Sequence, residues 1–262
     1  MFDESPTPYP AVNEVLNLLL SEAREVLGEQ FAGMYLYGSL SSGGFDPRSS
    51  DIDFLIVTVD NLDQKTIEDL EKMHQRIWDT DLKWASKLEG SYLPLEHLPR
   101  YEKSSWKYPT VNGGKFYLGP HGSDWIIQRH IIREQGFTLA GPEPKSLIDP
   151  VSPEDIRQAV IGALEGWWFP MLEEPHWLEK RGKEYHAYTI LSMCRSLHAL
   201  EHGTIASKQE ATSWGKEELD GRRREVIDRA RAVLTGDGEF DLFDQAIEFI
   251  RFTKERVMAG EQ

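Results

Sequence analysis

The stretches LYGS (residues 36–39) and SDID (residues 50–53), followed by the apolar run FLIV (residues 54–57), decide the fold class of this chain. Side chains alternate across a strand, so Asp51 and Asp53 are expected to project from one face. Two such charges about 4 Å apart repel by roughly 4 kcal/mol at an effective dielectric of about 20. A divalent cation relieves this repulsion, and carboxylate oxygens suit Mg²⁺. We therefore predict that Asp51 and Asp53 bind metal.

The LYGS stretch is expected to form a phosphate-binding turn at the end of the first strand. Gly38 lets the backbone approach a phosphate, and Ser39 offers an amide and a hydroxyl at the start of a short helix. The alternative is a plain loop between two strands, because Gly-Ser dipeptides are common in turns. Two aspartates at alternate positions ahead of an apolar run favour the phosphate site, since Asp is disfavoured in strands.

Hydrophobic spacing predicts that the first half of the chain contains both helices and strands. Residues 12–28 and 63–79 have helical spacing, and the predicted strands are residues 31–37, 51–59 and 87–95. This order predicts an α+β fold with a small mixed sheet covered by helices on one side. Residues 99–123, interrupted by Gly and Pro, are expected to form a long functional loop ahead of a helix at 124–135.

The second half is expected to be an all-α helical bundle. Its predicted helices span residues 153–168, 181–202, 207–214, 219–235 and 240–258. We assign residues 1–150 to the first domain and residues 151–262 to the helical domain, with a ligand cleft expected between them.

Composition narrows the classes of partner. With 44 acidic and 29 basic side chains the formal charge is −15, so nucleic acid would be repelled and a cationic small molecule attracted. The alternative is that the charge only confers solubility. Cys194 is the only cysteine, which excludes an internal disulfide, and we expect it to be buried. With no leader and no apolar run of about 20 residues, a cytoplasmic location without membrane contact is expected.

If the phosphate and metal predicted here serve a transfer to a hydroxyl group, a further group must take the hydroxyl proton, and a carboxylate within hydrogen-bond reach can do so. Glu89, at the head of the third predicted strand, is the candidate catalytic base, because an adjacent strand would bring it beside the aspartates. The alternatives are that Glu89 is an exposed strand-end residue, since order alone does not decide which strands pair, or that Glu96 is the base.

These motifs resemble the polymerase-beta-like nucleotidyltransferases, and within them the streptomycin and spectinomycin (aminoglycoside) adenylyltransferase family. LYGS and SDID match the family motifs position for position, and the resemblance covers most of the chain. It extends to SWKYP (105–109), LAGP (139–142) and DPV (149–151). The resemblance implies an antibiotic-resistance enzyme that transfers AMP from ATP to a hydroxyl with two Mg²⁺ ions.

The resemblance also implies roles for individual residues. Glu89 matches the catalytic base, and the implied nucleotide-binding residues are Gly38, Ser39, Ser50, Asp124, Arg195 and Lys208. Arg195 and Lys208 would neutralise phosphates from the helical domain. Taken without the resemblance, they are more simply explained as solvated cations near helix ends.

The acceptor segment departs from the family pattern. Phe116-Tyr117 replaces a tryptophan, and PHW (175–177) replaces Pro-Asp-Trp, so a histidine stands where the family has an acid. This change should weaken recognition of a cationic antibiotic. The candidate acceptor-binding residues are Tyr117, His176, Trp177, Glu184 and Tyr185.

We expect a monomeric O-adenylyltransferase acting on an aminoglycoside, an aminocyclitol or a similar hydroxylated small molecule. One alternative is the same chemistry on another metabolite or on a protein hydroxyl. The other is an ATP-binding regulator without turnover. The acceptor hydroxyl, and whether other triphosphates replace ATP, are left open by the sequence.

Overall fold

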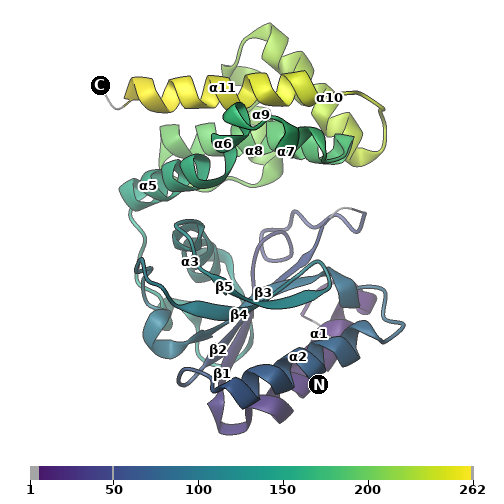
Figure 1. The fold of residues 1–262 in the computed structure, drawn as a ribbon, viewed down its shortest axis with the longest axis vertical. Helices are drawn as coiled ribbons and strands as arrows, with labels where there is room; N and C mark the ends of the chain where they lie inside the picture. The colour runs from purple at the N-terminus through teal and green to yellow at the C-terminus, as the bar shows by residue number, and fades with distance from the viewer. Residues whose placement is uncertain (1–5, 49, 261–262) are drawn as a thin grey trace. The chain divides into compact units, whose positions relative to one another are not determined.

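The computed structural model describes residues 6–48 and 50–260 and divides into two units, one up to Pro150 and one from Val151 onward (Figure 1). The N-terminal unit is a mixed sheet with helices, and the C-terminal unit is helical. In the described part of the chain, no helix combines the length and the apolar character needed to cross a bilayer.

The N-terminal unit is built on a six-stranded sheet in the order β5-β4-β3-β2-β1-β6. Strands β2 and β3 pair in parallel, and every other neighbouring pair is antiparallel. The mixed sheet predicted from the sequence is therefore present. Its strands are β1 (Phe31–Leu36), β2 (Ile52–Thr58), β3 (Leu88–Pro94), β4 (Lys107–Asn112), β5 (Lys115–Pro120) and β6 (Phe137–Ala140).

Two long helices cover one face of this sheet. α1 (Pro10–Leu27) and α2 (Gln64–Trp78) bury apolar stripes against the side chains of Met34, Ile56 and Tyr92. Asp63 caps α2 by accepting the Thr66 amide, as an N-cap aspartate does. Short turns of 3₁₀ helix span Gly28–Gln30, Ala85–Lys87 and Leu95–His97.

The expectation that helices cover only one side of the sheet is wrong. α3 (Asp124–Gln135) covers part of the opposite face, where Trp125 stacks on His121 with 3.5 Å between ring centroids. The His121 Nε2 lies 3.0 Å from the Ser91 hydroxyl on that face. The apolar side chains of this face need a cover of their own, which periodicity along a single helix does not reveal. A short helix, α4 (Pro144–Leu147), follows β6.

The predicted loop at residues 99–123 is also wrong in part, because it contains the β4–β5 hairpin. Gly113 and Gly114 have φ values of 55° and 69°. A two-residue hairpin turn of type I′ requires positive φ at both positions, which favours glycine. Glycines interrupting a segment indicate a loop, but the flanking β-branched and aromatic residues make this pair a hairpin signal. The four-residue edge strand β6 was not predicted either.

The C-terminal unit packs around one central helix, α8 (Lys183–His202), which contacts α5, α9, α10 and α11. Cys194 lies on α8 and is buried, as expected. Serine capping boxes begin α5 and α9. The helices besides α8 are α5 (Pro153–Ala163), α6 (Pro170–Glu173), α7 (His176–Glu179), α9 (Lys208–Glu218), α10 (Gly221–Thr235) and α11 (Phe243–Gly260).

The helix predicted at residues 153–168 does not stay α-helical to its end. Its last part, Leu164–Trp168, is a π-helical turn in which the Phe169 amide donates to the Leu164 carbonyl at 2.8 Å. Pro170 follows and has no amide hydrogen to continue the regular bonding. The turn leaves Trp168 buried and Trp167 47 % exposed.

Candidate active site

The pairing of β2 with β3 places Glu89 directly beside Asp53. In a parallel pair, residues in register lie on the same face of the sheet, and alternation puts Asp51 on that face too. Asp51 immediately precedes β2, so the three carboxylates occupy the N-terminal end of the two strands. The structure therefore brings together the three acids singled out in the sequence.

Gly38 makes room for Asp53. A Cβ atom on Gly38 would lie 2.1 Å from Asp53 Oδ2, and the residue has a φ of 67°. The Tyr37 amide also donates to the Asp53 carbonyl at 3.2 Å. Only glycine satisfies both the backbone conformation and the close approach of the carboxylate.

The short helix expected to begin at Ser39 is not present. Residues 38–43 form hydrogen-bonded turns, with the Ser42 amide donating to the Gly38 carbonyl at 3.1 Å. Gly43, with a φ of 74°, leaves the helical conformation after this single turn. Ser39 thus keeps its amide and hydroxyl at the strand end but gains no helix dipole.

Ser50 supports the loop ahead of β2. It is 5 % exposed, and its hydroxyl accepts the Asp46 amide at 3.0 Å. Its own amide donates to the Asp46 carbonyl at 2.9 Å. The structure therefore engages this predicted phosphate ligand in the hydrogen bonds of the loop.

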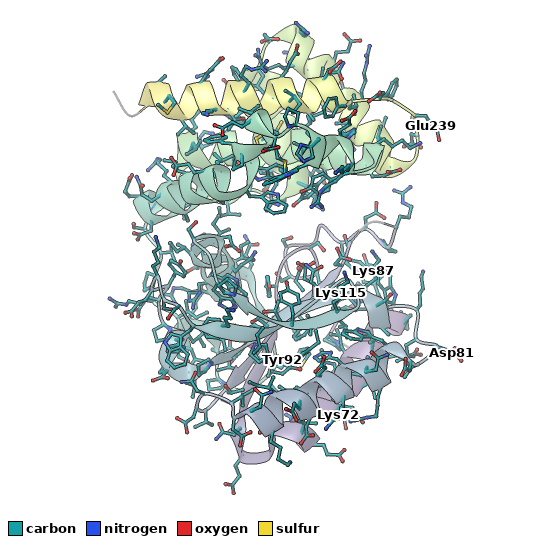
Figure 2. The ribbon with its side chains drawn as sticks, in the orientation of Figure 1. Lys72, Asp81, Lys87, Tyr92, Lys115 and Glu239 are labelled. Carbon is teal, nitrogen blue, oxygen red and sulfur yellow. The ribbon has the colours of Figure 1, made fainter. Side chains whose placement is uncertain are left out.

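The surroundings of Glu89 shift its pKa in opposing directions. Burial raises the pKa above its usual range, and the nearby charge of Asp51 raises it further. Asn112 lowers it by donating from Nδ2 to Glu89 Oε1 at 2.7 Å, and the Lys87 ammonium also lowers it. Lys87 Nζ lies 3.2 Å from Asp51 Oδ1. Figure 2 labels Lys87 in the N-terminal unit. The net effect is a raised pKa, which suits a group that must accept a proton near neutral pH.

Tyr37 connects these acids to the start of α3. Its buried hydroxyl has a pKa well above the usual range, because of burial first and then the charges of Asp53, Glu89 and Asp124. Asp124, in the first turn of α3, therefore shares the surroundings of the other two carboxylates. Tyr117, on β5, lies near the same site, since burial and then Glu89 raise its pKa.

The sequence did not predict three residues of this site. Tyr37 is buried beside the carboxylates, Lys87 pairs with Asp51, and Asn112 donates a hydrogen bond to Glu89. In the strand predicted at residues 87–95, alternation would place Lys87 on the face of Glu89, although in the structure Lys87 ends a 3₁₀ turn just ahead of β3. Asn112 had no such signal, because its place depends on the pairing of β4 with β3.

The donor set fits Mg²⁺ in the way this ion is usually bound. Within residues 6–48 and 50–260, no group of three or more His, Cys, Asp or Glu side chains is arranged to hold a metal alone. Mg²⁺ commonly takes only one or two carboxylates and completes its shell with phosphates and water. Asp51 and Asp53 on one face provide that pair, so no cage of three protein ligands is needed.

In the helical unit, the two predicted phosphate ligands lie on the side of α8 that carries Tyr188. Lys208 begins α9 and places Nζ 6.0 Å from the Tyr188 ring centroid. Arg195 lies seven residues after Tyr188 on α8, and therefore on the same side of the helix. The Arg195 Nε is buried and has no hydrogen-bond partner among the described residues.

The acceptor candidates of the helical unit lie on α7 and in the first turn of α8. Tyr185 belongs to an aromatic cluster, where it accepts a hydrogen bond from Trp167 Nε1 at 3.2 Å and lies under the guanidinium of Arg181 at 4.4 Å. His176 and Trp177 lie on α7, where His176 Nδ1 is 3.1 Å from Glu174 and Trp177 is 48 % exposed. Glu184 is exposed in the first turn of α8.

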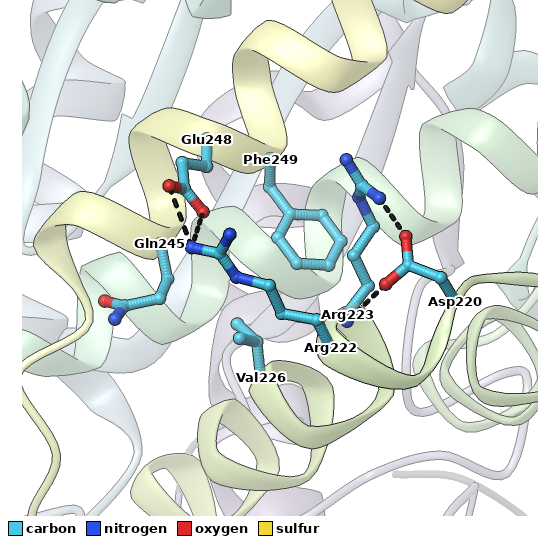
Figure 3. Close-up of a pocket in the computed structure, with 7 residues that line it drawn as sticks. All are labelled: Asp220, Arg222, Arg223, Val226, Gln245, Glu248 and Phe249. Atoms are coloured by element: carbon cyan, nitrogen blue, oxygen red, sulfur yellow. Dashed lines mark hydrogen bonds and ion pairs between the residues drawn. The ribbon is translucent and has the colours of Figure 1, made fainter.

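A surface recess of about 270 Å³ lies between α10 and α11 and contains none of the predicted site residues (Figure 3). Its charges satisfy one another, because Arg222 pairs with Glu248 at 3.0 Å and Arg223 pairs with Asp220. The lining residues are Asp220, Arg222, Arg223, Val226, Gln245, Glu248 and Phe249.

Comparison with known families matches both units in turn. Residues 20–108 match the nucleotidyltransferase domain family, and residues 146–257 match the family described as aminoglycoside adenylyltransferase, C-terminal domain. The first match includes the LYGS and SDID stretches, and the second includes Arg195 and Lys208.

Individual relatives align over most of the chain. An aminoglycoside (3'') (9) adenylyltransferase of Escherichia coli is 28 % identical, over 84 % of this chain and 85 % of the relative. A spectinomycin 9-adenylyltransferase of Campylobacter jejuni is 24 % identical, over 92 % of this chain and 94 % of the relative. The fold is similar to that of a spectinomycin adenyltransferase from Enterococcus faecialis solved with ATP and spectinomycin. That structure has a TM-score of 0.73 and 19 % identity, and the match covers 94 % of this chain and 98 % of that one.

Proposed function

Because the chain belongs to the aminoglycoside adenylyltransferase family within the nucleotidyltransferase superfamily, we propose that it transfers AMP from ATP to a hydroxyl of an aminoglycoside or aminocyclitol. The observation that supports this most directly is the register of β2 and β3, which pairs Asp53 with Glu89. A protein that only bound ATP would need no proton acceptor beside its metal-binding carboxylates. Residues 1–150 act as the nucleotidyltransferase domain and residues 151–262 as the helical domain.

Glu89 is the general base of this reaction. The acceptor oxygen attacks the α-phosphorus of ATP, and its proton passes to the Glu89 carboxylate. The bond between the α-phosphorus and the oxygen that bridges to the β-phosphorus breaks, and pyrophosphate leaves. The raised pKa of Glu89 makes it a better proton acceptor than an exposed glutamate.

The triphosphate is held by main-chain and charged groups. The Gly38–Ser39 turn binds phosphate with its amide and hydroxyl, Ser50 holds the loop in place, and Asp124 contacts the nucleotide. Arg195 and Lys208 neutralise phosphate charge from the helical domain. Asp51 and Asp53 would hold two Mg²⁺ ions, which would supply charge neutralisation and activation of the acceptor oxygen.

The acceptor is a small hydroxylated molecule. Its candidate contacts are Tyr117 near Glu89 in the first unit and, considered by themselves, Tyr185, His176, Trp177 and Glu184 in the helical unit. A second acceptor class, a less cationic metabolite or a protein hydroxyl, is favoured by one observation. The guanidinium of Arg181 stacks on Tyr185, so a positive charge stands among the acceptor candidates. Like charges across a binding site disfavour a polycationic ligand.

Pyrophosphate release with a panel of acceptors tests the proposal. Purified monomeric enzyme with ATP and Mg²⁺ should release pyrophosphate with spectinomycin, streptomycin or another aminoglycoside, and the antibiotic should gain the mass of AMP. Release with only uncharged hydroxylated acceptors would support the second class. Tight ATP binding in calorimetry without pyrophosphate release from any acceptor would contradict the enzyme and favour a regulator.

A further inference from the structure

The end of strand β4 faces the candidate base across the sheet. β3 and β4 are antiparallel, with Gly90 opposite Val111 and Ser91 opposite Thr110. Extending this register by one pair sets Asn112 opposite Glu89, with both side chains on the same face of the sheet. We propose that Asn112 is a positioning residue that holds Glu89 in the orientation needed to deprotonate the acceptor, an inference that rests on the function proposed above.

The contact between the two side chains is short and directional. Asn112 Nδ2 donates to Glu89 Oε1 at 2.7 Å. A side-chain amide has no proton that titrates near neutral pH, so it orients the carboxylate without competing for the transferred proton. Since the bond engages Oε1, the second carboxylate oxygen is left to receive the hydroxyl proton.

Asn112 is itself held firmly by the hairpin. It is the last residue of β4, it pairs with Lys115 on β5, and Gly113 and Gly114 close the turn between them. Side chains carried by paired strands are positioned more reproducibly than those on irregular loops. The β4–β5 hairpin was not predicted from the sequence. Its paired strands fix the position of the Asn112 side-chain amide.

Without Asn112, Glu89 has a competing partner. Lys87 ends the 3₁₀ turn just ahead of β3, its charge acts on Glu89, and its ammonium already contacts Asp51 at 3.2 Å. A glutamate side chain has three rotatable bonds, so loss of the amide would let the carboxylate turn toward this ammonium. An ion pair with Lys87 would engage the oxygens that the acceptor hydroxyl needs. Asn112 therefore acts by selecting one orientation of Glu89 over another.

A nearly identical bond elsewhere in the same unit provides a matched control. Asn61 Nδ2 donates to Glu96 Oε1 at 2.6 Å, beyond the C-terminal ends of β2 and β3. Both of these residues are exposed. Removal of this bond breaks the same chemical contact at the opposite end of the strand pair.

The test compares Asn112→Ala and Asn112→Asp with Asn61→Ala and Asn61→Asp. We expect the Asn112→Ala change to lower kcat by about 10-fold to 100-fold, because misplacing a reacting group by about 1 Å costs up to about 10²-fold. Asn112→Asp keeps the shape but cannot donate and repels Glu89, so its kcat should fall further. KM for ATP and Tm should stay at the wild-type value, and both Asn61 variants should match wild type.

Two results would overturn the inference: kcat of both Asn112 variants within about threefold of wild type, or a fall in kcat that is matched by an equal rise in KM for ATP. Failure of the proposed function would show differently, as a wild-type enzyme that adenylates no acceptor. In that case crystal structures of wild type and Asn112→Ala decide the point. Glu89 turning toward Lys87 in the variant supports the positioning role, and an unchanged Glu89 contradicts it.

Discussion

The two ends of the parallel strand pair β2–β3 carry similar residues in different surroundings. At both ends an asparagine amide donates to a glutamate, Asn112 to Glu89 at 2.7 Å and Asn61 to Glu96 at 2.6 Å. Glu89 is half-buried beside Asp53, whereas Glu96 is exposed. Burial and Asp51 raise the pKa of Glu89. The comparison shows that the surroundings, and not the residue type or its hydrogen bond, distinguish a candidate base from a surface acid.

The difference arises from what closes each end of the sheet. At the end with Glu89, the buried ring of Tyr37 and the first turn of α3 surround the carboxylates. At the other end, the chain runs into the exposed residues Val59 and Asp60. Water screens charges at the exposed end and screens them less at the enclosed one.

The largest effect is expected from replacing Glu89, with Glu96 as the matched control. Glu89→Gln should lower kcat by about 10²-fold to 10⁴-fold, the usual contribution of a general base, because the amide cannot accept the proton. The Kd of ATP from calorimetry should change little. Glu96→Gln should leave both quantities at the wild-type value. Equal loss of ATP binding and turnover in Glu89→Gln would remove its assignment as base.

The second-largest effect is expected from replacing Asp53 near the start of β2, compared with Asp60 beyond its end. Asp53→Asn should reduce activity by at least about 10²-fold, since even residues that only support metal ligands contribute about 10-fold to 100-fold. It should also raise the Mg²⁺ concentration that gives half-maximal turnover. Asp60→Asn, beyond the other end of β2, is the control and should do neither. A Mg²⁺ titration that is the same in both variants would argue against metal binding by Asp53.

A pair of glycines separates backbone strain from crowding. Gly38→Ala and Gly28→Ala both force alanine into a positive φ, of 67° and 53°, which should lower the free energy of unfolding by roughly 1–3 kcal/mol in each variant. Only Gly38→Ala adds a Cβ within 2.1 Å of Asp53, whereas Gly28 has open space. Activity should therefore fall by about 10²-fold in Gly38→Ala alone. Denaturant titration and turnover assays measure the two effects, and equal activity of both variants would contradict the crowding argument.

The smallest effect is on pH dependence. Because the folded pKa of Glu89 is raised, the acidic limb of kcat/KM should lie above the usual glutamate range near about 4.3, with activity lost as pH falls through that pKa. A raised carboxyl pKa also means that the folded state binds the proton more tightly than the unfolded state. Ionised Glu89 therefore destabilises the fold above its folded pKa, and this penalty disappears as pH falls below the unfolded value. Glu89→Gln should thus raise Tm at neutral pH, and Glu96→Gln should not.

The local motifs predicted the order of elements well where spacing and turn chemistry agreed. The helix at residues 63–79 begins at its Asp63 cap, and the three predicted strands correspond to β1, β2 and β3. The predictions failed where a local signal had two meanings. Gly113-Gly114 is compatible with a loop and with a hairpin turn, and it forms the hairpin. Gly38-Ser39 is compatible with a helix start and with a single turn, and it forms the single turn.

By itself the sequence determined that Asp51 and Asp53 share one face, because alternation along a strand needs no knowledge of neighbours. The Gly-Ser turn also indicated that residue 38 needs a backbone without a side chain, but the sequence did not show that Asp53 is the group that approaches it. The tertiary structure decided that β3 lies beside β2, that Glu89 and not Glu96 joins the aspartates, and that Asn112 and Tyr37 complete their surroundings. Strand order depends on which apolar faces pack together across the whole unit, and no local spacing along the chain encodes that choice.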